Sequence, residues 1–171
     1  MTATEFQLNV IPLKDKLYRF ALRMLANAEE ARDTVQEVMI KVWESGKPLA
    51  DYDSIEAWCM TLTRNRSLDI LKVNSNRQRH LKVIKRGSDV AHMPADKVEQ
   101  TQQVNYVIDE IKNLPVVQRE LIELRDFQEK TYEEMCEITG LEMTQVKVYL
   151  FRARKAVREK INALNAYGIE A

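Results

Sequence analysis

The chain has 171 residues, enough for one domain or two small ones. Its 30% charged and 45% hydrophobic residues exclude both a disordered chain and an integral membrane protein. The 26 basic and 26 acidic side chains cancel, which excludes a uniformly basic nucleic-acid binder but not one with segregated charge. Only 4 Gly and 4 Pro interrupt a sequence rich in helix formers, and this predicts an all-α protein.

No segment of the sequence indicates export or membrane insertion. The first ten residues lack a basic stretch followed by an apolar one, and no run of about 18 apolar residues occurs. Cys59 and Cys136 do not make a disulfide framework, and both lie in apolar helical patterns, so we expect two small buried side chains. These features predict a protein of the reducing cytoplasm.

Two helices are expected at the start of the chain. Apolar residues recur at helical spacing over 13–24 and again over 31–42, with a break at Asn27. Gly and Pro then end the second helix, and 46–54 is expected to be a loop.

A third helix is expected to follow this loop. Ser54 suits its N-cap, and the helical pattern continues through Leu71. Its inner face is expected to carry Ile55, Trp58, Cys59 and Leu62.

Apolar periodicity is lost over residues 74–103. The stretch contains Asn, Ser, Gly and Pro, and its middle, about 87–98, is expected to link two helical domains. Periodicity returns from Val104, and Pro115 is expected at the first position of a further helix.

The most specific pattern begins at Thr131. Thr131 and Glu134 have the spacing of a capping box at the start of a short helix, and Gly140 suits a tight turn at its end. Glu142 or Thr144 can cap the next helix, which is basic on its outer side. This arrangement predicts a helix-turn-helix, although an ordinary helical hairpin has the same outline.

Charge is segregated along the chain. Residues 62–86, the first basic island, carry 8 basic and one acidic side chain, and residues 144–160, the second basic island, carry 6 basic and one acidic. Residues 96–142 between them carry 5 basic and 12 acidic side chains. A charge run is usually a solvated helix face, but two islands separated by an acidic block favour two contacts with DNA.

Four segments, in order along the chain, resemble the sigma factors of bacterial RNA polymerase. Residues 33–43 resemble the polymerase-docking helix of that family, and 57–72 resemble its promoter-melting helix. Residues 114–120 and 146–154 resemble its C-terminal helix-turn-helix domain. The length and two-domain layout resemble the extracytoplasmic-function (ECF) subgroup.

The resemblance implies an all-α fold of two small helical domains joined by a flexible linker. A sigma-two-type domain for polymerase docking and −10 recognition is expected over 8–80, and a linker over 81–103. A sigma-four-type helix-turn-helix domain for −35 recognition is expected over 104–167.

The resemblance also implies the site residues. The polymerase-binding set is Asp33, Gln36 and Glu37, which lie at i, i+3 and i+4. The −10 set is Arg64, Asn65, Arg66, Asp69 and Lys72. The −35 set is Thr144, Gln145, Lys147, Val148, Tyr149, Phe151, Arg152, Arg154 and Lys155.

Two details qualify this assignment. In the family, a base of the non-template strand enters a pocket formed by the third helix and the loop before it, which is 46–54 in this sequence. We expect Trp43 and Trp58 to pack in the core rather than stack on bases. Val148-Tyr149 stand where Ser-Arg is common in the family, so the usual base readout by that Arg is absent.

The expected function is that of an alternative sigma factor, which binds RNA polymerase core, directs it to promoter DNA and initiates transcription. A stand-alone helix-turn-helix regulator that binds DNA without polymerase is the alternative. The family implies an anti-sigma factor, often a membrane protein, and we expect a monomer when free. No cofactor, metal, catalytic residue or small-molecule substrate is expected, since the histidines, His80 and His92, have no partner at metal-ligand spacing.

Overall fold

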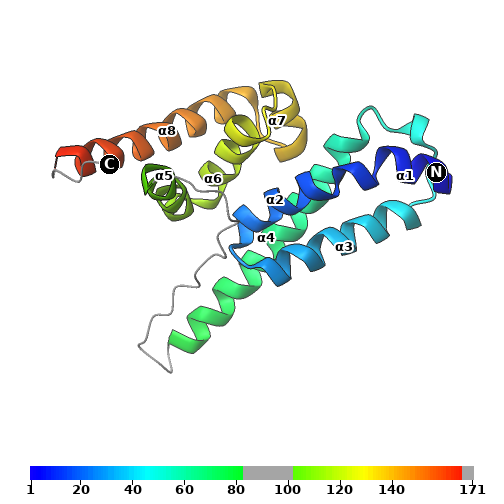
Figure 1. Cartoon of the computed structure of the whole chain (residues 1–171), viewed down its shortest axis with the longest axis horizontal. Coiled ribbons are helices and arrows are strands. Elements are labelled where there is room, and N and C mark those ends of the chain that lie inside the picture. Colours follow the sequence, from blue (N-terminus) through cyan, green and yellow to red (C-terminus); the bar gives the residue numbers. More distant parts are fainter. Residues whose placement is uncertain (83–101, 167–171) are drawn as a thin grey trace. The chain divides into compact units, whose positions relative to one another are not determined.

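The computed structural model describes residues 1–82 and 102–166 (Figure 1). The described part is helical and contains no strand. The chain divides into two compact units, unit 1 (Met1–Pro94) and unit 2 (Ala95–Ala171). The predicted all-α fold of two helical domains is confirmed.

Unit 1 is built around three helices. These are α2 (Lys14–Leu25), α3 (Ala28–Glu44) and α4 (Ile55–Lys82), each of which packs against the other two. A short helix α1 (Ala3–Asn9) precedes them, and single 3₁₀ turns occur at Ile11–Leu13 and Leu49–Asp51.

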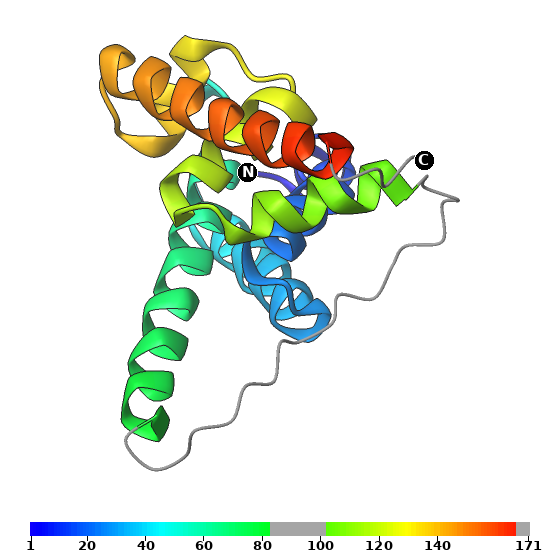
Figure 2. The same ribbon diagram turned by 90° about the vertical axis from the view of Figure 1, so that its left-hand side faces the viewer.

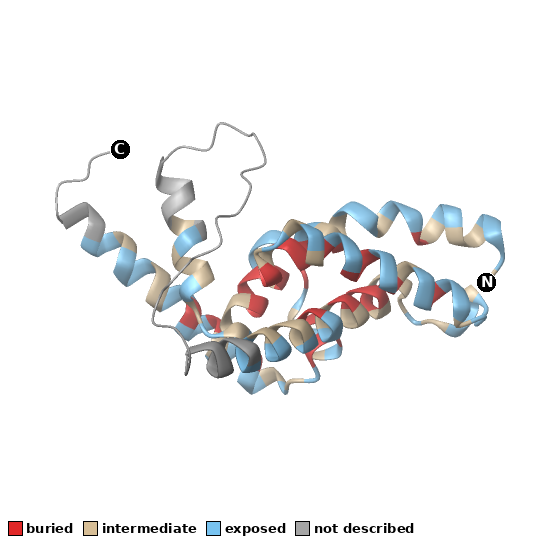
Figure 3. Cartoon of the chain, turned by 90° about the horizontal axis from the view of Figure 1, so that it is seen from below, coloured by how far each residue is buried: buried red, intermediate tan, exposed pale blue. Residues whose placement is uncertain are grey.

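The core of unit 1 follows the predicted pattern on α2 and α3. The buried faces of these helices, red in Figure 3, meet inside the unit. They carry Leu17, Phe20, Ala21 and Met24 on α2 and Ala31, Val35, Val38 and Val42 on α3.

The predicted inner face of α4 is largely wrong. Of the four expected residues, only Cys59 is buried, and the other buried positions are Ala57, Met60, Thr63 and Ser67. The hydroxyls of Thr63 and Ser67 donate to the carbonyl oxygens four residues earlier, each at 2.8 Å. Because the helix itself satisfies these hydroxyls, small polar side chains can be buried where α2 and α3 pack closely.

The N-terminal helix was not expected, and it changes the surroundings of Trp43. A capping box between Thr2 and Glu5 starts α1. Phe6 packs its ring edge-on against Trp43, with 5.4 Å between ring centroids. Trp43 is 48% exposed, so the expectation that it lies in the core is wrong.

The two cysteines differ in their environment. Cys59 is fully buried, and burial raises the pKa of its thiol to about 12. Cys136 is half-buried, so the expectation of a buried side chain is wrong there.

Unit 2 contains four α-helices in its described part. They are α5 (Gln102–Asn113), α6 (Val116–Ile122), α7 (Tyr132–Thr139) and α8 (Met143–Ala166), and α8 packs against the other three (Figure 2). Pro115 is the N-cap of α6 rather than its first helical residue. A π-helical turn, η3 (Glu123–Phe127), extends α6 and was not predicted.

The expected linker centre, 87–98, lies outside the described residues, as does His92. Helix α4 extends to Lys82, further than the expected Leu71, because a helix can continue through residues that show no apolar periodicity. The domain limits 8–80, 81–103 and 104–167 therefore stay predictions. Within the described residues, no cluster of potential metal ligands occurs and no helix is long and apolar enough to cross a membrane.

We predict that Ser67→Leu destabilises unit 1 by about 1–3 kcal/mol, because a larger side chain cannot fit a fully buried position. Urea unfolding followed by tryptophan fluorescence checks this, since both tryptophans lie in unit 1. Ser67→Ala, which keeps the position small, is the control and should shift the transition much less. Equal unfolding midpoints for wild type and Ser67→Leu would show that α4 does not pack closely at this position.

Candidate functional site

The predicted polymerase-binding residues share one exposed face of α3. Asp33, Gln36 and Glu37 are all exposed, on the side opposite the buried valines. Glu37 forms a two-pronged ion pair with Arg66 of α4, with Nε–Oε2 at 2.6 Å and Nη2–Oε1 at 2.9 Å. The structure therefore joins a residue of the predicted polymerase-binding set to a residue of the predicted −10 set.

The predicted −10 residues lie along the outer side of α4. Asn65, Asp69 and Lys72 are exposed at i, i+4 and i+7, so they share one face. Arg64 is half-buried, and its guanidinium donates to Asn65 Oδ1 at 3.1 Å. Four of the five side chains are thus exposed, and two of the cations already contact neighbouring side chains.

The loop before α4 is held by a small side-chain network. The Ser45 hydroxyl donates to the Val42 carbonyl at 2.8 Å, so it accepts from the Tyr52 hydroxyl 2.9 Å away. The Tyr52 ring lies against Trp58, with 4.7 Å between ring centroids. Ser54 accepts from the Ala57 N–H at 3.1 Å, as its predicted N-cap role requires.

The predicted helix-turn-helix is present in unit 2. The Thr131 N–H donates to Glu134 Oε2 at 2.8 Å, and the Glu134 N–H donates to Thr131 Oγ1 at 3.2 Å, which completes the capping box of α7. Gly140 ends α7 with φ of 71°, a conformation that glycine adopts without strain. The Glu142 N–H donates to the Gln145 side-chain oxygen at 3.0 Å at the start of α8.

Helix α8 has a buried side and an exposed cationic side. Val146, Leu150 and Ala153 are 2% exposed or less and anchor the helix in unit 2. Eight residues of the predicted −35 set are exposed: Thr144, Gln145, Lys147, Val148, Phe151, Arg152, Arg154 and Lys155. The ninth, Tyr149, is half-buried beside the core.

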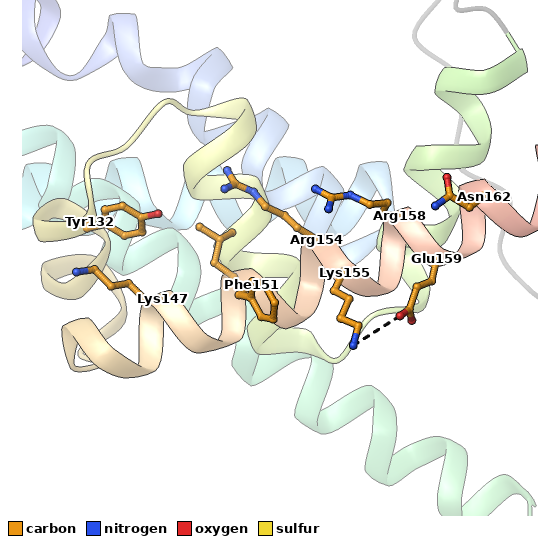
Figure 4. Close-up of a pocket in the computed structure, with 9 residues that line it drawn as sticks. Tyr132, Lys147, Phe151, Arg154, Lys155, Arg158, Glu159 and Asn162 are labelled. Carbon is orange, nitrogen blue, oxygen red and sulfur yellow. Dashed lines mark ion pairs between the residues drawn. The ribbon is translucent and has the colours of Figure 1, made fainter.

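A shallow pocket runs along this exposed side of α8. Figure 4 shows its lining, which includes Lys147, Phe151, Arg154 and Arg158 of α8 together with Tyr132 of α7. The Tyr132 ring lies within cation–π range of Lys147, with the ammonium 5.8 Å from the ring centroid. Tyr132 thus supports one of the predicted DNA-binding cations.

An aspartate of η3 holds another predicted DNA-binding cation. Both Arg154 Nε and Arg154 Nη2 donate to the Asp126 carboxylate, the former at 3.2 Å. This pairing raises the pKa of Arg154 above its usual value. Sequence reasoning did not identify Asp126 or Tyr132, because each reaches α8 from another element and neither pairing has a fixed sequence spacing.

We predict that acid weakens the helix-turn-helix through Glu134. The Lys130 side chain, 2.8 Å away, and the Thr131 N–H hold the pKa of Glu134 below its ordinary value. Its contribution to stability is therefore complete above the unfolded-state pKa, about 4.3, and is lost as the pH falls through the lower folded-state pKa.

Glu134→Gln should remove this part of the acid dependence of unit 2, and thermal unfolding by circular dichroism measures it. The exposed Glu137 of the same helix supplies the control, since Glu137→Gln should leave the acid dependence as in wild type. If Glu134→Gln and wild type lose stability in parallel on acidification, the carboxylate does not stabilise the motif.

Comparison with known proteins identifies the class of protein to which this chain belongs. Residues 11–77 match the family Sigma-70 region 2, and residues 105–157 match Sigma-70, region 4. Together these regions span α2, α3 and most of α4 in unit 1, and α7 with the first part of α8 in unit 2.

Full-length relatives narrow the assignment. The ECF RNA polymerase sigma factor RpoE of Cereibacter sphaeroides is 30% identical over 149 residues, which span 86% of this chain and 81% of that protein. The RNA polymerase sigma factor SigV of Bacillus subtilis is 26% identical over 145 residues, which span 85% and 84%.

A solved structure shows the same fold. The sigma factor RpoE of Bartonella quintana, crystallised with the anti-sigma factor NepR, superposes with a TM-score of 0.73 at 22% identity and covers 92% of this chain and 96% of its own. The chain belongs to the ECF sigma factors of bacterial RNA polymerase. It is an alternative sigma factor that directs the polymerase to promoters, and sigma factors are transcription initiation factors rather than catalysts.

Proposed function

We propose that three exposed surfaces divide the work of this sigma factor. The α3 stripe (Asp33, Gln36 and Glu37) binds core polymerase, the outer side of α4 contacts the −10 element, and the exposed side of α8 contacts the −35 element. The observation that carries the proposal is the two-sided character of α8, whose buried side leaves a row of cations facing solvent. A cationic helix after a Gly turn suits the major groove of duplex DNA.

The α3 stripe offers acceptors to a basic partner surface. Carboxylate and amide groups that are exposed lose little hydration until a partner covers them, and charge-assisted hydrogen bonds then favour the complex. Because Glu37 also pairs with Arg66, core polymerase that binds at Glu37 also affects the ion pair of Arg66, a cation of the predicted −10 set.

The α4 surface suits binding to DNA strands that are separating. Arg66 and Lys72 can neutralise phosphates, and Asn65 carries both a donor and an acceptor for base edges. The loop 46–54 adjoins this surface, and the Ser45–Tyr52–Trp58 contacts hold it in place before DNA arrives. A preformed loop favours capture of an unpaired base, whose extrusion is otherwise unfavourable by a few kcal/mol.

On α8, we assign base contacts to the residues up to Arg152 and phosphate contacts to the residues that follow. Recognition helices present their first turns to base edges, where Lys147 and Arg152 suit guanine. Arg154 and Lys155 lie further along and suit phosphates.

We also propose an anti-sigma factor as a partner of this chain. The structural neighbour from Bartonella quintana was crystallised with such a protein, NepR, which supports a partner of the same class here. We place the free sigma factor in the cytoplasm as a monomer, with no small-molecule substrate. Core polymerase and promoter DNA are then its working partners.

Charge reversal on α3 tests the docking assignment. Asp33→Lys should weaken binding to core polymerase at least about tenfold, because it places a cation against a basic partner surface. Asp33 is a cleaner choice than Glu37, whose reversal also breaks the pair with Arg66. Asp15→Lys makes the same charge change at an exposed site of α2 and should leave core affinity unchanged.

A second variant, Arg152→Ala, tests the assignment of α8 to promoter DNA. It should reduce promoter-specific initiation in vitro while leaving core affinity as in wild type, since Arg152 lies on the exposed side of α8 in unit 2. Wild-type core affinity in Asp33→Lys would refute the docking assignment. A loss of core affinity in Arg152→Ala would refute the assignment of α8 to DNA.

A further inference from the structure

The centre of the exposed side of α8 is apolar in its N-terminal half. Val148 is 45% exposed and Phe151 is 69% exposed, and the two lie one turn apart. Both point away from Val146 and Leu150, which are buried in unit 2. Neither side chain therefore contributes much to the core, and the fold does not explain why they are apolar.

Cations surround this apolar centre. Lys147 and Arg152 lie on its two flanks, and Lys155 continues the same face one turn beyond Phe151. Figure 4 shows Phe151 extending from α8 between Lys147 and Lys155. A single exposed apolar residue needs no explanation. Two neighbouring apolar side chains between cations, however, match a ligand that has apolar groups flanked by anions.

Duplex DNA offers one such group in its major groove. The 5-methyl of thymine is the apolar element of the base-pair code there, and phosphates border the groove on both sides. We propose that Val148 and Phe151 read thymine methyl groups in the −35 element and thereby set part of its sequence. This inference rests on the proposed function of α8 as the −35 reader.

Two further observations favour apolar readout at this position. The side-chain oxygen of Gln145 already accepts from the Glu142 N–H, whereas a bidentate contact with adenine needs both ends of the amide. Tyr149 is half-buried rather than central on the exposed face. The side chains in the middle of this surface, in the N-terminal half of α8, are therefore Val148 and Phe151.

Replacement of thymine by deoxyuridine tests the proposal directly, because it removes the methyl group and keeps base pairing. Promoters that the wild-type holoenzyme transcribes from genomic fragments supply the −35 element. Each thymine of that element is then replaced singly, and holoenzyme binding is measured. We expect one or two positions at which the wild type loses about fourfold in affinity, the value for one buried methyl group.

The variants Val148→Ala and Phe151→Ala locate the contact on the protein. Each should bind the thymine promoter more weakly than wild type and lose its sensitivity to deoxyuridine at one of those positions. Val117→Ala is the matched control, since it removes the same atoms as Val148→Ala from a partly exposed site on α6. It should keep the wild-type sensitivity to deoxyuridine.

The outcomes separate the inference from the function on which it rests. Methyl readout is overturned if the −35 element contains no thymine, or if no deoxyuridine substitution changes the affinity of the wild-type holoenzyme. In either case, Arg152→Ala still tests the role of α8 in DNA binding. Deoxyuridine sensitivity that persists in both alanine variants overturns the assignment to these residues. Weaker core binding by Phe151→Ala with unchanged deoxyuridine sensitivity overturns it in favour of a protein-binding surface.

Discussion

The burial of one side of α8 is the contact on which the proposed DNA interface depends. Val146, Leu150 and Ala153 lock the helix against the rest of unit 2, and this fixes which side chains face solvent. A rotation of α8 by a quarter turn would bury cations, which is strongly unfavourable without partners. The capping box of α7 and the left-handed Gly140 set where α8 begins, so local backbone geometry and packing determine the same surface.

Sequence periodicity predicted α2 and α3 because their buried residues are large and apolar and recur at regular spacing. It failed on α4, where Thr63 and Ser67 are buried and their hydroxyls bond to the helix backbone. Helix α1 was missed because it has no buried residue, although the capping box of Thr2 and Glu5 was a usable signal. The π-helical turn η3 has no periodicity that a sequence pattern reports.

Much of the candidate site was predictable, but its internal pairing was not. Exposed polar residues on α3 and the cations of α8 follow from helical spacing, and both lie where they were expected. The pairs Glu37–Arg66 and Asp126–Arg154 join residues of different elements, so only the packed structure reveals them. Trp43 was expected in the core because it lies in an apolar helical pattern, but it is half exposed, with its ring against Phe6.

The chain has no net charge, although its predicted DNA surfaces on α4 and α8 are rich in cations. One arginine of each predicted DNA surface also has a carboxylate partner, so we expect the free chain as a whole to attract phosphates only weakly. The direct test is the affinity of the free chain and of its holoenzyme for the same promoter duplex, measured at several salt concentrations. The account predicts weak, unselective binding by the free chain and tight, selective binding by the holoenzyme. Tight and selective binding by the free chain would contradict it.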